Sequence, residues 1–379
     1  MARISAFQAE GPGSTPGRRI CEHHKMEQEQ KPKKEKLKTR VVKFHNKYYK
    51  HLLIIPAILL LFCFVYLGVF YSNNGDFMHK DISLVGGTTV TIYEKIDSIE
   101  LKDHISDQLE SLTVREISDL ITREQIAIIV ETTSDEGATR VILEDYLGYA
   151  LTDENSSFEF TGSALSESFL GQLILAIITA FLFMGWVVFI IFGKKVKIKI
   201  ITGVLSILPI LLFFIFDSSL NLTIGFSITA LLINSFFYFK NSIPSLAIIL
   251  SAFADIFMTF TLFNLLGMKM STAGIVAFLM LIGYSVDTDI LLTNRILKRR
   301  EDSLNKRFLS AFKTGITMTL TSLLAILVAL FIVSSFSAVL TKIFTVLVIG
   351  LSFDILNTWI TNVSILKWHV KRKEGKNEA

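Results

Sequence analysis

Eight long apolar segments dominate this sequence, and each is long enough to cross a membrane. A spanning helix needs about 20 predominantly apolar residues, because the hydrocarbon core of a bilayer is about 30 Å thick. The segments are 52–71, 169–192, 200–216, 221–239, 244–266, 272–293, 315–334 and 343–366. Because 51% of the residues are hydrophobic, the chain does not belong to the ordinary soluble class. We therefore expect a polytopic α-helical membrane protein.

Lysine and arginine gather in alternate connections between these segments. Basic residues lie in 31–50, 193–199, 295–307 and 367–373 and at Lys240, whereas the connections 217–219, 267–270 and 334–338 hold one lysine in total. Under the positive-inside rule the basic connections are cytoplasmic. We expect a multi-pass protein of the cell membrane, with both termini cytoplasmic: a basic tail over 1–51 and a second tail over 367–379. The first tail lacks the apolar centre of a signal peptide, and either Met1 or Met26 could start it.

Residues 72–168 form the one long polar stretch between two spans, and by the same rule they lie outside. They contain 20 acidic and six basic residues. Alternating or β-branched patterns predict strands over 86–95, 113–122, 124–133 and 156–162, and apolar spacing predicts helices over 98–112 and 136–151. The resulting βαββαβ order is that of a small α+β ferredoxin-like domain. This domain lies in the sequence between the first span, 52–71, and the remaining spans of the bundle, 169–366.

Four carboxylates stand inside the predicted spans, with no lysine or arginine at comparable depth. They are Asp255, Asp287, Asp289 and Asp354. An aspartate at the centre of a membrane helix costs about 2.5–3.5 kcal/mol, so at least some of the four should be protonated much of the time. Such carboxyls could form a proton relay. The alternative is structural, because a protonated aspartate can simply hydrogen-bond a neighbouring helix.

Other polar residues accompany these acids. Gly283, Ser285 and Thr288 fit a close-packed or hydrated helix face, and Asp287 shares a stripe with Asn294. The hydroxyls of 314–322 could solvate a proton path or could bond back to helix carbonyls. No nucleotide loop, zinc pattern or nucleophile motif occurs, so we expect no enzyme activity and no cofactor.

Several motifs point to one family. The stretch 244–321, which contains "GYSVDTDILLTNR" from Gly283, resembles the SecF family of the protein-export machinery, in its archaeal branch. "VGGTT" (85–89) and "GSALSESFLGQ" (162–172) resemble two shorter signatures of that family. The signature residues carried by the resemblance are Gly86, Gly87, Thr88, Gly283, Tyr284 and Ser285.

The resemblance implies a fold and a function. The fold is that of the resistance-nodulation-division transporter group, with six spans and an outer ferredoxin-like domain, so 193–240 would be an inserted hairpin. The function would be that of an auxiliary subunit that couples the proton gradient to late steps of protein export; sodium is the other candidate ion. Implied partners are a SecD-like subunit, a SecY-type channel, exported polypeptides and membrane lipid, but no nucleic acid.

This sequence departs from the family at positions that bear on the ion path. Bacterial members carry Asn-Asp-Thr where this chain has Asp287-Thr288-Asp289, and an arginine where it has Thr317; Ser83 and Ser163 replace a usual acid and a usual proline. The relay candidates are therefore Asp287, Asp289, Asp255, Asp354 and Thr317. Two other functions remain open: a proton-coupled exporter of small molecules, which usually carries two such halves in one chain, and a scaffold subunit that conducts no ions.

Overall fold

The structure, a computed structural model, describes residues 48–49, 51–119, 121–216, 219–298 and 304–377. Most of the predicted basic tail 1–51 therefore lies outside the described residues. The described residues are mainly helical and include a small antiparallel sheet, so the predicted fold class is confirmed.

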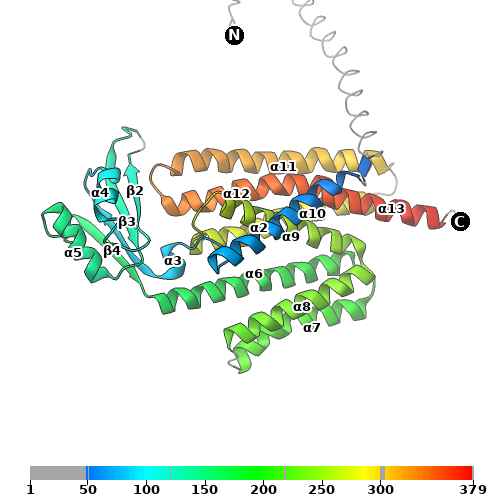
Figure 1. The fold of residues 1–379 in the computed structure, drawn as a ribbon. Helices are drawn as coiled ribbons and strands as arrows, with labels where there is room; N and C mark the ends of the chain where they lie inside the picture. The colour runs from blue at the N-terminus through cyan, green and yellow to red at the C-terminus, as the bar shows by residue number, and fades with distance from the viewer. Residues whose placement is uncertain (1–47, 50, 120, 217–218, 299–303, 378–379) are drawn as a thin grey trace, which may run out of the picture. The chain divides into compact units, whose positions relative to one another are not determined.

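Within the described ranges, eight helices are long and apolar enough to span a membrane. Their bounds are α2 Ile54–Asn74, α6 Ser163–Phe192, α7 Val196–Phe216, α8 Leu220–Asn241, α9 Ile243–Leu265, α10 Thr272–Lys298, α11 Leu304–Val333 and α12 Ala338–Leu356. The last span continues through a π-helical turn, η1 (Asn357–Asn362), into α13 (Val363–Asn377). The α+β domain lies at one end of this bundle (Figure 1), which we call the domain end; the opposite end is the far end.

Helix α10 forms the centre of the bundle, since it packs against α6, α9, α11 and α12. Towards the domain end, Leu281 of α10 shares an apolar core with Leu347 and Leu351 of α12. Gly350 permits this close approach, because a Cβ atom there would lie 2.4 Å from Leu281 Cδ2. The spans are thus sealed together by tightly packed apolar side chains on the domain side of their midpoint.

Helices α7 and α8 form the hairpin that corresponds to the predicted insertion 193–240. Both pack against α6, and α8 also contacts α9. A buried polar seam joins them: the Asn234 amide donates to Ser206 Oγ at 3.0 Å, and the Ser206 hydroxyl lies 3.4 Å from the Leu182 carbonyl oxygen. Hydrogen bonds of this kind favour one register between membrane helices.

The α+β domain contains four strands and two main helices. Its elements are α3 Ile82–Val85, β1 Gly87–Ile92, α4 Ser98–Ile105, β2 Thr113–Ser118, β3 Gln125–Thr132, α5 Glu136–Leu147 and β4 Ser156–Thr161. The strands pair antiparallel in the order β2-β3-β1-β4. Both main helices are shorter than predicted; α5 ends at Leu147 because Gly148 adopts a left-handed C-cap conformation, with φ of 76°.

The Gly-Gly signature has a steric reason at the start of β1. Gly86 and Gly87 have φ of 94° and 142°, which side chains rarely permit. A Cβ atom would lie 2.6 Å from Ser163 Cα at the first position and 2.2 Å from the Thr132 carbonyl oxygen at the second. The glycines therefore allow β1 to pass directly beside β3 and the start of α6.

Tyr149 gives the domain a testable pH dependence. Its hydroxyl donates to Glu94, and burial, this hydrogen bond and the Glu94 charge together raise the pKa of Tyr149 from 10.0 to about 12. Because the pKa of Tyr149 is higher in the folded state than in the unfolded state, the protonated side chain stabilises the folded domain. This contribution to the free energy of unfolding is complete below about pH 10 and is lost as the pH rises towards about 12. We expect the domain to unfold at a lower urea concentration at about pH 11 than at about pH 9, and Tyr149→Phe to shrink that difference. Circular dichroism of the solubilised chain during urea titration measures it; an equal difference in both proteins would contradict the assignment.

Candidate functional site

Three aspartates from three different spans converge in the middle of the bundle. Asp255 comes from α9, Asp289 from α10 and Asp354 from α12, and all three are 0% exposed. We call these three side chains the acid cluster. In the described part of the chain, no lysine, arginine or histidine nitrogen is recorded within 4.0 Å of these carboxylates. The negative charge is therefore not neutralised by direct ion pairs.

The π-helical turn η1 supplies most of the hydrogen-bond donors of the acid cluster. The Asn357 amide donates to Asp255 Oδ1 at 2.8 Å, and the Asn362 amide donates to Asp289 Oδ1 at 2.8 Å. From α10, the Ser285 hydroxyl donates to the second oxygen of Asp255. Because a π-helical turn holds one residue more than an α-helical turn, it shifts the register of the polar residues that follow Asp354.

One hydroxyl joins two of the acids. Thr358 Oγ1 lies 2.8 Å from Asp289 Oδ1 and 3.0 Å from Asp354 Oδ1. A hydroxyl carries a single proton, so it can donate to only one of these oxygens. Both contacts are hydrogen bonds only if the other carboxyl is protonated and donates to the threonine oxygen. The geometry thus suits a cluster that holds at least one shared proton.

Polar groups extend from the acid cluster towards the far end of the bundle. Several buried atoms have no hydrogen-bond partner among the described residues: Asp289 Oδ2, Asp354 Oδ2, Ser251 Oγ, Thr293 Oγ1 and Asn362 Oδ1. By position along their helices, Ser251, Thr293 and Asn362 lie on the far side of the acids. Buried polar atoms of this kind normally bind ordered water. On the domain side, by contrast, the apolar core of Leu281, Leu347 and Leu351 closes the bundle.

Two of the predicted relay residues lie elsewhere. Asp287 is exposed on the surface of α10, although it is only two residues from Asp289. Thr317 is exposed on α11, and its hydroxyl donates to the Lys313 carbonyl oxygen at 2.7 Å. Of the relay candidates, the structure brings together Asp255, Asp289 and Asp354.

Sequence reasoning missed three members of this site: Asn357, Thr358 and Asn362. Their signal was present, since "DILNTWITN" places five polar side chains within nine residues of an apolar span. Insertion of asparagine or threonine into a membrane costs less free energy than insertion of a carboxylate, so their presence in a span is a weaker indication of a functional site. The site is therefore built largely by the last span, which contributes one acid and three donors.

Together these features define an integral membrane protein with one small α+β domain and a buried acidic centre. Residues 215–372 match the family model described as "Protein export membrane protein SecD/SecF, C-terminal". SecF of Methanocaldococcus jannaschii is 32% identical over 335 residues, which cover 86% of this chain and 98% of that protein. SecF of Methanothermobacter thermautotrophicus is 32% identical over 331 residues, which cover 86% of this chain and 94% of that protein. The chain belongs to the SecF family of protein-export membrane proteins, so the predicted family is confirmed.

A solved structure supports the same fold. The crystal structure of SecDF, a translocon-associated membrane protein from Thermus thermophilus, superposes with a TM-score of 0.53 at 15% identity. The match covers 85% of this chain and 38% of SecDF. The relatives carry the names of export proteins and not of enzymes, and a multi-pass membrane protein is what both the family and the eight apolar helices indicate.

Proposed function

We propose that this chain is an auxiliary subunit of the Sec translocase that couples the proton gradient to late steps of protein export. The observation that carries this proposal is the acid cluster, in which three fully buried carboxyls have no ion-pair partner among the described residues. Thr358 lies between Asp289 and Asp354, while Asn357 donates to Asp255 and Asn362 donates to Asp289. Burying three unpaired negative charges in a bundle would cost many kcal/mol. Uptake of protons removes that cost, and their release restores it, so the packing of α9, α10 and α12 depends on protonation.

The path of the ion follows from the asymmetry around the acid cluster. If the far end is cytoplasmic, as the basic connections indicate, the polar groups at Ser251, Thr293 and Asn362 connect the acids to the cytoplasm. The apolar contact of Leu281 with Leu347 and Leu351 then separates them from the outside. Ion transport requires a second conformation of the bundle. In that conformation the leucine contact on the domain side would separate, and the polar groups on the far side would no longer be accessible from the cytoplasm.

Helix α12 is a rigid link between the acid cluster and the domain. Asp354 and Lys342 are 12 residues apart on α12, which corresponds to about 18 Å along the axis. Lys342 forms a buried ion pair with Asp81, at the start of α3 in the domain. A shift of α12 on protonation would therefore move the domain, which we propose contacts the emerging polypeptide. One proton crossing 100 mV releases about 2.3 kcal/mol. Two protons therefore supply about 4.6 kcal/mol, a little less than the roughly 5.5 kcal/mol that a shift from 1:99 to 99:1 requires, and an added pH gradient would supply the rest.

The exposed polar face of α10 fits a partner subunit. Asp287 is exposed beside Gly283 and Tyr284, in the middle of a span. A carboxylate that faces lipid is expensive, and such residues normally face protein or water. We propose that a SecD-like subunit covers this face, and that the two subunits together associate with a SecY-type channel.

Reconstitution tests this function. Vesicles that contain the chain, its SecD-like partner and the channel should release an exported polypeptide faster when a proton gradient is imposed, and a protonophore should abolish the difference. A sodium gradient in place of the proton gradient tests the other candidate ion. Vesicles without this chain are the control. Release that is independent of both gradients would support a scaffold subunit instead.

A further inference from the structure

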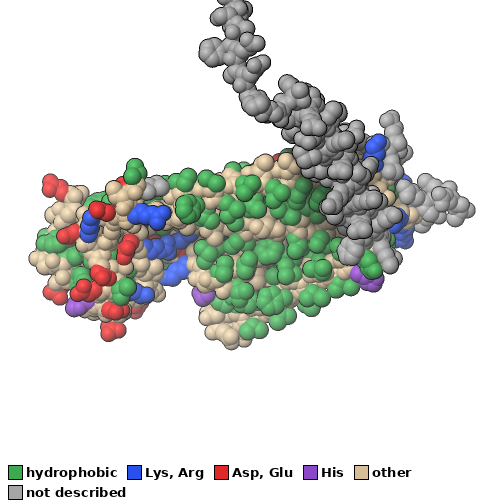
Figure 2. All heavy atoms as spheres, turned by 90° about the horizontal axis from the view of Figure 1, so that it is seen from above, with side chains coloured by type: hydrophobic (Ala, Val, Ile, Leu, Met, Phe, Trp, Pro, Cys, Tyr) green, Lys and Arg blue, Asp and Glu red, His purple; other side chains and the backbone are tan. Residues whose placement is uncertain are grey.

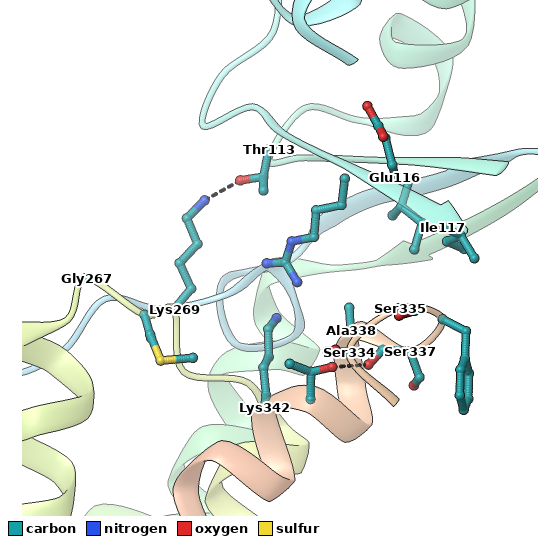
Figure 3. A pocket seen from close by; sticks show the side chains of 15 residues that line it. Thr113, Glu116, Ile117, Gly267, Lys269, Ser334, Ser335, Ser337, Ala338 and Lys342 are labelled. Atoms are coloured by element: carbon teal, nitrogen blue, oxygen red, sulfur yellow. Dashed lines mark hydrogen bonds between the residues drawn. The ribbon is translucent and has the colours of Figure 1, made fainter. Parts of the chain in front are cut away.

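A cavity of about 390 Å³ lies where the domain meets the domain end of the bundle. Its walls are β2, the connection between α9 and α10, and the connection between α11 and α12 (Figure 3). Thr113, Arg115 and Ile117 alternate along β2 and so line it from one face of the sheet. We call this space the junction cavity.

Basic side chains converge on the junction cavity, which Glu116 also lines and where two of the three basic side chains have a carboxylate partner. Eight basic residues occur in the domain, in the connections at the domain end and in the first two turns of α12. They are Lys80, Lys95, Lys102, Arg115, Arg123, Arg140, Lys269 and Lys342. Three of these, Arg115, Lys269 and Lys342, line this one cavity. Figure 2 shows Lys and Arg side chains between the acidic surface of the domain and the apolar surface of the bundle.

Two of the three cations keep donors for a ligand. Lys342 is taken up by its buried pair with Asp81. Lys269 Nζ donates to the Thr113 hydroxyl at 2.6 Å, and among the described residues no carboxylate is recorded within 4.0 Å of it. Arg115 Nη2 forms an ion pair with Glu131 Oε2 at 3.6 Å, which is longer than a hydrogen bond, so the guanidinium N–H groups are not taken up by this carboxylate. An ammonium has three donors and a guanidinium five, so both can bind a further anion.

The start of α12 adds to this positive environment. Ser337 caps the helix, with its hydroxyl 3.3 Å from the Leu340 amide nitrogen, and both Ser337 and Ala338 line the cavity. The N-terminus of a helix carries a partial positive charge and free amide groups. Cations from two separate parts of the fold and a helix N-terminus therefore surround one space.

We propose that the junction cavity binds a phosphate group, held by Arg115 from the domain and Lys269 from the bundle. The cavity lies at the level where spans α9 and α12 end, which is where lipid headgroups lie. The phosphate could come from an anionic lipid in the leaflet on the domain side or from free phosphate. Bound there, it would tie β2 to the α9–α10 connection. This proposal does not depend on proton coupling.

Native mass spectrometry of the full chain tests the site. The protein is delipidated in detergent and titrated with phosphatidylglycerol, phosphatidylcholine or inorganic phosphate. We expect wild type to retain phosphatidylglycerol in preference to phosphatidylcholine, and Arg115→Gln with Lys269→Gln to weaken that binding roughly tenfold or more. Displacement of the lipid by millimolar inorganic phosphate would identify free phosphate as an equivalent ligand; retention would identify the lipid.

A matched control separates the cavity from general surface charge. Lys95→Gln with Lys102→Gln removes the same number of charges from the domain at positions that do not line the cavity, and it should leave binding unchanged. The single variant Lys269→Gln keeps Arg115 beside Glu131 and provides a second measurement if the double variant does not fold. Equal binding by wild type, the cavity variants and the control, or no preference for the anionic ligands in wild type, would overturn the proposal.

Discussion

Replacement of Asp289 by asparagine is expected to reduce gradient-driven export to the level of vesicles or cells that lack this chain. Asparagine keeps the size of the side chain and can still accept from Asn362 and Thr358, but it cannot gain or lose a proton. Because the packing around the acid cluster is retained, the protein should accumulate normally. The loss would therefore be one of coupling and not of folding.

Two further variants make this prediction specific. Asp289→Glu restores a titratable group and should recover part of the activity, whereas a purely structural role would make the longer side chain worse than asparagine. Asp103→Asn makes the same chemical change on the exposed surface of α4 and should leave export unchanged. Export is measured as gradient-dependent release from vesicles. Full activity in Asp289→Asn at normal protein levels would refute the role of this acid in coupling.

The aspartates of the spans could be identified from the sequence as candidate functional residues, because a carboxylate in a membrane is energetically unfavourable. The sequence did not show which side of its helix each aspartate occupies. Asp287 and Asp289 are two residues apart, which places them about 200° apart around a helix. Periodicity alone does not tell which of two such faces meets protein, since both lie in one apolar run. The structure resolves this, with Asp289 fully buried and Asp287 exposed. The π-helical turn at Asn357–Asn362 is a second obstacle, because it breaks the spacing on which helical-face arguments depend.

The domain was easier to foresee than its attachment to the bundle. Alternating residues and turn residues mark the four strands, and their lengths follow from local pairing. Contacts between Lys342 and Asp81, by contrast, join residues 261 positions apart. Ser118 and Ser335, which are joined through their backbones at 3.1 Å, are also distant in sequence. Such contacts depend on how α12 and the sheet pack in three dimensions, for which a single sequence carries no periodic signal.

The Lys342–Asp81 ion pair leads to the second large prediction, which concerns stability. Both side chains are 8% exposed, and one oxygen of Asp81 has no hydrogen-bond partner among the described residues. Lys342→Met would leave the Asp81 carboxylate buried without its cation. Breaking a buried pair in this way typically costs about 3–5 kcal/mol, because an uncompensated charge remains. We expect a clear fall in the thermal unfolding midpoint of the solubilised chain and faster proteolysis at the junction between domain and bundle.

The double variant Lys342→Met with Asp81→Asn separates the pair from the packing of its parts. Both variants carry the same Lys342→Met substitution, and they differ only in whether residue 81 keeps its negative charge. The double variant has no unpaired buried charge, so it should be more stable than Lys342→Met alone. The Asp81 backbone, which donates to the Met270 carbonyl oxygen at 2.8 Å, is unaffected by the change of side chain. If the effects of the two substitutions simply add, the two charges do not stabilise each other, and the link between α12 and the domain must depend on other contacts.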